Sequence, residues 1–377
     1  MAADIYDILK AAVEMKASDI LLVPGEPPIV RISGELRKFT KEHTLDIAQC
    51  HEVVYSMLDR RQIASFENEL ELDCCYAIPD VGRFRVNVLR QENGIAAVLR
   101  VVNELIPTPE SIGVPASVVK LNELPRGLVL VTGPTGSGKS TTIAALVEQV
   151  NTSRAKHVIT IEDPIEYVYQ NKKCVIDQRE VGIHTNSFAA ALKHSLRQNP
   201  DIIVVGEMRD RETMALALAA AETGHLCFST LHTQDAPSTV DRIIDEFPPD
   251  SQPKLRAQLA TLLTAVISQV MLPRKSGGMI CAREIMILNS AVATHIREGK
   301  IHQLYGVIEA GGQFGMQTMD QCLATLVTKG EVLPEVAMAK ARDPQSLRAL
   351  MGLRGPAPAP AQSSPAGVPP RAPVRPT

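Results

Sequence analysis

A glycine-rich segment carries the clearest chemical signal in this chain. Residues 133–140 fit the pattern G-x-x-x-x-G-K-[ST] at every fixed position. In this pattern backbone N–H groups and a helix N-terminus converge on phosphate oxygens, while the lysine reaches the β- and γ-phosphates and the hydroxyl binds Mg²⁺. The segment therefore predicts a site for ATP or GTP with Mg²⁺. The expected nucleotide contacts are Gly133, Pro134, Thr135, Gly136, Ser137, Gly138, Lys139, Ser140 and Thr141.

A carboxylate is expected beside this phosphate-binding loop. The apolar run at 201–206 predicts a buried strand, and Glu207 follows it directly. The carboxyl ends of parallel strands form the crevice in which ligands bind. We therefore predict that Glu207 holds Mg²⁺ through water, in concert with Ser140. The alternative is an ordinary strand-end carboxylate that faces solvent.

Three further acids follow the strand predicted at 157–162. They are Glu162, Asp163 and Glu166. Carboxylates this close repel one another unless a cation or a water network absorbs their charge. Phosphoryl transfer to water needs an oriented nucleophile more than covalent chemistry, so one of these acids is expected to position water or act as the general base.

Two histidines flank the strand predicted at 225–230. His225 and His232 do not have the i,i+4 spacing of metal ligands, and by themselves they are as readily loop or core histidines. Ser229, Thr230 and His232, at the end of the strand, could instead sense the γ-phosphate.

Arginines gather in the first hundred residues. Arg83 and Arg85 alternate along a predicted strand, so their side chains point to one face, and Arg100 lies on the next strand. Guanidinium groups delivered to a phosphate by a rigid domain are how arginine fingers act. Solvated surface arginines are the ordinary alternative.

Composition limits the class of protein. A chain of 377 residues suggests about two domains, and a formal net charge of −3 gives no bulk attraction to nucleic acid. There is no apolar run long enough to span a bilayer and no basic-then-apolar secretion signal, so a cytoplasmic protein is expected. Seven scattered cysteines without a C-x-x-C pair favour free thiols over disulfides or zinc.

Hydrophobic periodicity predicts a small α+β domain over 1–105. Helices are expected at 4–16 and 46–66, and strands at 20–23, between 25 and 33, and at 70–78, 83–90 and 95–102. Asn93-Gly94 predicts a hairpin turn between the last two strands.

Clustered prolines and Gly113 predict a linker over 106–116, followed by an α/β domain over 117–352. Four strands, at 127–132, 157–162, 201–206 and 225–230, alternate with helices, which indicates a mostly parallel sheet. Helices are expected to dominate from 253 to 350. The Pro/Ala-rich segment 353–377 is expected to be disordered.

Taken together, these motifs resemble the secretion-type ATPases, and in particular their type IV pilus retraction branch. The likeness extends from Ala17 to Lys340 and includes the phosphate-binding loop, the family's Asp box at 161–166, the segment 206–210, the His box at 224–233 and the segment 315–322. It implies a RecA-like P-loop ATPase domain behind a PAS-like N-terminal domain. It also implies a homo-hexamer with nucleotide between subunits that couples ATP hydrolysis to pilus retraction and twitching motility.

The resemblance implies a role for each candidate residue. Glu166 becomes the first choice for the water-activating base, with Glu162 and Asp163 in support, and Glu207 serves Mg²⁺. His225 and His232 would link nucleotide state to structure. The arginines expected to contact phosphates are Arg83, Arg85 and Arg100. The implied partner is the pilus platform protein of the inner membrane, at whose cytoplasmic face the motor would dock. Related pilus ATPases are possible partners, and no direct contact with nucleic acid is expected.

Two missing features favour retraction within this superfamily. Extension and type II secretion ATPases usually carry a tetracysteine zinc element and a further N-terminal domain, and neither is found in this sequence. One departure concerns the family's C-terminal signature, which reads Ala291-Val-Ala-Thr-His-Ile-Arg-Glu298 here and lacks the central Arg-Asn. The alternatives are an extension or secretion-pore ATPase, or a nucleotide-gated accessory module that hydrolyses little itself.

Overall fold

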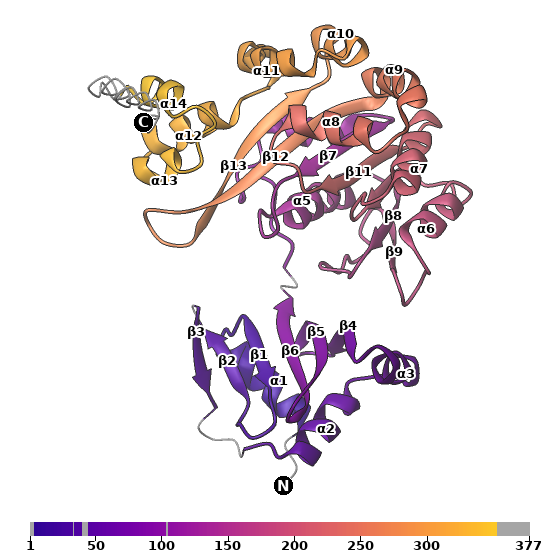
Figure 1. Ribbon diagram of the computed structural model, residues 1–377, viewed down its shortest axis with the longest axis vertical. Coiled ribbons are helices and arrows are strands. Elements are labelled where there is room, and N and C mark those ends of the chain that lie inside the picture. Colours follow the sequence, from indigo (N-terminus) through magenta and orange to yellow (C-terminus); the bar gives the residue numbers. More distant parts are fainter. Residues whose placement is uncertain (1–3, 33, 40–43, 103–104, 353–377) are drawn as a thin grey trace, which may run out of the picture.

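Two β-sheets organise the chain. The computed structural model describes residues 4–32, 34–39, 44–102 and 105–352, so the expected tail at 353–377 lies outside the described residues. Figure 1 shows the N-terminal sheet with its helices as one lobe, at the bottom of the view, and the larger sheet with its helices as another, above it. No helix within the described ranges combines the length and apolar character that crossing a bilayer requires.

The N-terminal sheet is antiparallel, with strand order β3-β2-β1-β6-β5-β4. Its strands are β1 (Asp19–Leu22), β2 (Ile29–Ile32), β3 (Glu35–Lys38), β4 (Glu71–Ile78), β5 (Gly82–Gln91) and β6 (Gly94–Val102), and its helices are α1 (Ile5–Glu14), α2 (Ile47–Ser56) and α3 (Arg60–Glu69). The single helical region expected at 46–66 is two helices, because Asp46 and Asp59 each form a capping box that starts a new helix. Strand β3 was not expected, since all four of its residues are exposed and leave no apolar pattern.

The larger sheet contains seven strands in the order β13-β12-β7-β11-β10-β8-β9. They are β7 (Gly127–Thr132), β8 (His157–Glu162), β9 (Val175–Glu180), β10 (Ile202–Val205), β11 (Leu226–Leu231), β12 (Leu263–Pro273) and β13 (Met279–Ile287). All neighbouring pairs are parallel except β12 with β13. The prediction of a mostly parallel, helix-covered sheet is confirmed.

Helices cover both faces of this sheet. Alternation along β7 sends Leu128 and Leu130 into one core and Val129 and Val131 into the other. The first core is shared with α6 (Phe188–Ser195), α7 (Arg211–Glu222), α8 (Ala236–Asp245), α9 (Gln252–Leu262), α10 (Ser290–Glu298) and α11 (Leu304–Ala310), and the second with α4 (Ala116–Val119) and α5 (Lys139–Ser153). Strands buried on both faces read as continuous apolar runs, which is why the sequence revealed them.

The expectation of helices throughout 253–350 is wrong for 263–287. There the chain forms the long antiparallel hairpin of β12 and β13, turned by Gly277 and Gly278, which both have positive φ angles. Most of each strand is buried within the sheet, so the apolar residues form nearly continuous runs, which periodicity does not distinguish from a buried helix. Beyond it, α12 (Met319–Thr328), α13 (Pro334–Met338) and α14 (Pro344–Leu350) pack at the end of the hairpin (Figure 1).

Candidate nucleotide site

The glycine-rich loop connects β7 to α5, as its pattern predicts. Gly138 stands at the N-cap of α5 with φ +84°, a left-handed conformation that favours glycine. The Lys139 ammonium folds back over the loop and donates hydrogen bonds to the carbonyl oxygens of Gly133, at 2.8 Å, and Pro134, at 3.1 Å. The first turn of the helix and the lysine therefore face the same space.

A cavity of about 560 Å³ opens over this loop at the carboxyl ends of the parallel strands. It collects the phosphate-binding loop, the acids that follow β8, the acid that follows β10 and the end of β11, together with two arginines of the N-terminal sheet. The predicted residues that line it are Thr135, Gly136, Gly138, Lys139, Ser140, Thr141, Glu162, Asp163, Glu166, Glu207, His232, Arg85 and Arg100.

Glu207 lies between two basic side chains. Its carboxylate oxygens are 2.9 Å from Arg209 Nε and 3.2 Å from His232 Nε2. The Thr230 hydroxyl donates to the Gly206 carbonyl at 2.6 Å, which fastens the end of β11 to the turn that presents Glu207. The end of the His box is therefore joined to the acid after β10. Arg209 was not singled out from the sequence, where it reads as one more charged residue at a helix start.

Glu162, the first acid of the Asp box, fixes this segment through hydrogen bonds. Glu162 Oε1 accepts hydrogen bonds from Thr160 Oγ1 at 2.6 Å and Gln178 Nε2 at 3.2 Å. Its Oε2 accepts from the Glu166 backbone N–H at 3.4 Å. Burial raises the pKa of Glu162 despite these three donors. Glu162 therefore shapes the segment, while Glu166 presents its own carboxyl to the cavity.

Charge and hydrogen bonding connect the loop with the acids. Burial lowers the pKa of Lys139, while the nearby carboxylates of Glu207 and Glu166 oppose that shift. The Thr141 hydroxyl lies 2.9 Å from the Tyr167 hydroxyl, which joins α5 to the residue after Glu166. The acids and the Lys139 ammonium group therefore face the same cavity.

Five of the predicted residues do not line this cavity. Three of them, Gly133, Pro134 and Ser137, belong to the phosphate-binding loop itself, and the other two, His225 and Arg83, lie elsewhere. His225 precedes β11, where its Nδ1 is 3.0 Å from the Ala220 carbonyl oxygen. At about 3.3 Å per strand residue, His225 lies on the order of 20 Å from His232 along the strand. Arg83 forms an ion pair with Glu180 at 3.0 Å. Arg85 and Arg100, by contrast, are direct partners across β5 and β6 and both line the cavity.

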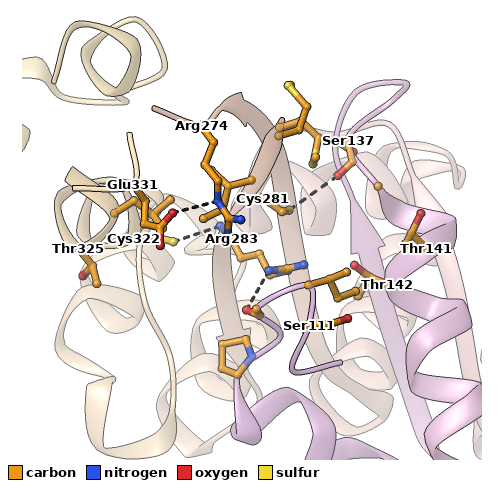
Figure 2. Close-up of a pocket in the computed structure, with 18 of the residues that line it drawn as sticks. Ser111, Ser137, Thr141, Thr142, Arg274, Cys281, Arg283, Cys322, Thr325 and Glu331 are labelled. Carbon is orange, nitrogen blue, oxygen red and sulfur yellow. Dashed lines mark hydrogen bonds and ion pairs between the residues drawn. The ribbon is translucent and has the colours of Figure 1, made fainter. Parts of the chain in front are cut away.

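A second cavity, of about 410 Å³, also adjoins the loop and α5 (Figure 2). Ser137, Thr141 and Thr142 form one wall, and the β12–β13 hairpin and the linker form the others. The buried Arg283 donates to the Gly113 carbonyl at 3.0 Å, which ties the hairpin to the linker. Sequence reasoning missed this cavity because it assigned the hairpin residues to helices.

Known proteins share this arrangement over most of the chain. The family described as type II/IV secretion system protein matches residues 1–295. The type IV pilus retraction ATPase PilT of Pseudomonas aeruginosa is 45% identical over 343 residues, which are 91% of this chain and 99% of that protein.

A twitching motility protein of Neisseria gonorrhoeae is 46% identical over 85% of this chain and 86% of its own length. The crystal structure of the pilus retraction motor PilT with bound ADP superposes with a TM-score of 0.87 at 44% identity, covering 92% of this chain and 99% of that one. The chain therefore belongs to the type II/IV secretion system protein family, as one of its PilT-like members.

Proposed function

We propose that this chain hydrolyses ATP with Mg²⁺ to drive retraction of type IV pili, and thereby twitching motility. The observation that carries the proposal is a single cavity lined by most of the phosphate-binding loop, the Asp-box acids, Glu207 and two arginines. These are the parts that phosphoryl transfer needs: groups that cradle phosphate, groups that neutralise charge and a group that orients water.

The donor set around the loop fits Mg²⁺. Ser140 and Glu207 offer hard oxygen atoms, and no cluster of three His, Cys, Asp or Glu side chains that could hold a metal ion by itself occurs among the described residues. That set suits an ion that takes most of its ligands from water and nucleotide. When bound, Mg²⁺ would neutralise charge on the phosphates. Arg209 and His232 hold the Glu207 carboxylate, which favours contact with the ion through water.

Glu166 is the residue we assign to water activation. Its backbone is held by Glu162, and its side chain lines the cavity with Lys139. In this assignment the carboxylate accepts a proton from the water whose oxygen bonds to the γ-phosphorus, while the bond from that phosphorus to the β–γ bridging oxygen breaks and ADP leaves. Lys139 stabilises the phosphate charge. Asp163 and Glu162 support the segment.

Arg85 and Arg100 are proposed to contact phosphates. The Arg100 side chain is 70% exposed and pairs with Asp19 at 2.9 Å, so it is free to exchange that partner for a stronger anion. We do not assign this role to Arg83, which Glu180 engages. In the homo-hexamer that we propose, the phosphates would belong to this subunit or to a neighbour.

The second cavity suits the rest of the nucleotide. It adjoins the same loop and helix, and its walls combine Met271 and Ile280 with hydroxyl groups and a buried guanidinium (Figure 2). Apolar walls with a few placed polar groups are typical of pockets for a base and ribose. We propose that base and ribose bind there, where they would also touch the linker.

Pilus retraction requires that the motion driven by ATP hydrolysis be transmitted to the base of the pilus. We propose that the motor is cytoplasmic and docks on a membrane-embedded platform protein, so that domain movement after hydrolysis releases pilin subunits from the base of the fibre. Related pilus ATPases could share that platform.

Counting surface pili by electron microscopy tests this function. Cells whose only copy carries Lys139→Ala should accumulate pili and lose twitching motility, because the variant loses the ammonium that binds phosphate. Cells carrying Lys254→Ala, an exposed lysine on α9, serve as the matched control and should resemble the parent. Bald cells would instead indicate an extension motor, and unchanged pili would indicate an accessory or secretion role.

A further inference from the structure

An ion pair joins the two sheets of this chain. Arg83 lies on β5 of the N-terminal sheet, and Glu180 is the last residue of β9 at the edge of the larger sheet. The Arg83 Nη2 and Glu180 Oε2 atoms are 3.0 Å apart. The Glu180 side chain is only 3% exposed and that of Arg83 20%, so the pair is shielded from solvent.

The same carboxylate oxygen holds the Asp-box segment. Glu180 Oε2 also accepts a hydrogen bond from the backbone N–H of Ile165 at 3.1 Å. Ile165 directly precedes Glu166. Glu180 is in addition the register partner of Glu162 at the end of the β8–β9 ladder. One buried oxygen atom therefore connects the N-terminal domain with the backbone that presents the proposed base.

The energetics make this oxygen sensitive to Arg83. A buried carboxylate is stable only while donors and an opposite charge compensate for its lost hydration. Arg83 Nε is buried without a hydrogen-bond partner, so the guanidinium depends on its contact through Nη2. If the N-terminal domain moves away, Glu180 loses its counter-charge and must shift toward water or toward other donors. The Ile165 N–H would then lose its fixed acceptor.

We propose that Arg83 is a positioning residue that makes hydrolysis depend on docking of the N-terminal domain, acting through Glu180 and Ile165 on the orientation of Glu166. This inference rests on the proposed function, because it concerns the same hydrolysis site. Arg83 touches neither nucleotide nor water in this mechanism. It differs in that respect from Arg85, its neighbour on the same strand, which lines the nucleotide cavity.

The test measures steady-state ATP hydrolysis and the affinity for a fluorescent ATP analogue in the full-length chain. Arg83→Ala should lower kcat by about 10- to 100-fold, the scale of a small misplacement of a catalytic group. The Kd of the analogue should stay within about twofold, since the phosphate-binding loop is untouched. Arg83→Lys, which keeps the charge, should recover part of kcat. Arg37→Ala removes an exposed arginine paired with Glu35 on the N-terminal sheet and should leave both quantities at parental values.

A double-mutant cycle shows whether the two residues act as one unit. Glu180→Gln keeps an acceptor for the Ile165 N–H but loses the charge that pairs with Arg83, so its kcat should also fall. The double variant Arg83→Ala/Glu180→Gln should be no slower than the worse single variant. Thermal unfolding of each variant checks that the fold is retained, and Arg83→Lys and Glu180→Gln preserve side-chain volume should the alanine variant unfold.

Several outcomes would overturn the proposal. They are parental kcat in Arg83→Ala, a loss of affinity as large as the loss of kcat, and multiplicative effects in the double variant. If the parent chain itself hydrolyses no ATP, the proposed function fails. An active parent with an equally active Arg83→Ala variant refutes only the inference about Arg83.

Discussion

Two glycines of the phosphate-binding loop give the sharpest quantitative prediction. Gly133 has φ +137°, and a Cβ placed on it would lie 2.3 Å from the backbone oxygen of Gln269 on β12 and 2.7 Å from Ser137 Oγ. Gly136 has φ +79°, and a Cβ there would have no atom within 4 Å. Both positions strain an L-residue, but only Gly133 meets rigid backbone. The two alanine variants therefore separate conformational strain from steric conflict.

The magnitudes follow from those contacts. Gly136→Ala should cost about 1 kcal/mol, the penalty of a left-handed conformation. In Gly133→Ala a comparable strain adds to forced movement of a packed strand, for a total of about 4 kcal/mol. In a domain of about 230 residues each kcal/mol lowers Tm by roughly 2–4 °C. Gly133→Ala should therefore unfold roughly 10 °C below the parent, and Gly136→Ala only a few degrees below it.

Thermal unfolding followed by circular dichroism measures both shifts, first without nucleotide and then with Mg²⁺ and ATP. A ligand that binds the folded state raises Tm, so the parent and Gly136→Ala should gain stability from nucleotide. Gly133→Ala should gain little, because displacing the loop also displaces Lys139, whose ammonium bonds to the Gly133 carbonyl. Equal decreases in Tm for the two variants would refute the argument from the Gln269 contact.

Three further predictions concern acidic residues. Glu166→Gln should slow hydrolysis severely while sparing nucleotide affinity, and normal turnover would remove Glu166 from the role of base. Burial raises the pKa of the Glu162 carboxyl group, so the folded state holds the carboxyl proton more tightly than the unfolded chain does. Above the folded-state pKa the group ionises inside the fold, which lowers the free energy of unfolding. Glu162→Gln should therefore raise Tm at about pH 8, with the gain disappearing near pH 4; a gain that does not change with pH would contradict this sign. Asp210 caps α7 by accepting from the Thr213 backbone N–H at 2.8 Å, so Asp210→Ala should cost about 1 kcal/mol and Asp210→Asn much less, by thermal unfolding. Loss of hydrolysis at unchanged Tm in Asp210→Ala would place Asp210 in the site instead.

Local sequence determined the phosphate-binding loop and the four central strands around it. The phosphate-binding loop is contiguous, and its glycines, lysine and flanking strand and helix are all readable within about 25 residues. The four strands β7, β8, β10 and β11 are buried on both faces, so each is a short apolar run followed by a chemically active residue. Glu162 and Glu207 therefore meet the loop at one edge of the sheet, as parallel topology requires.

Tertiary structure decided which distant residues share a site. Arg83 and Arg85 have the same residue type and point to one face of β5, yet one meets Glu180 and the other the nucleotide cavity. His225 and His232 belong to one motif, but a strand separates them and only His232 reaches Glu207. The β12–β13 hairpin, which forms a wall of the second cavity, has no short-range signal that distinguishes it from helix. The contacts of Arg83, of His232 and of the hairpin depend on packing between segments far apart in the sequence, whose geometry no local pattern encodes.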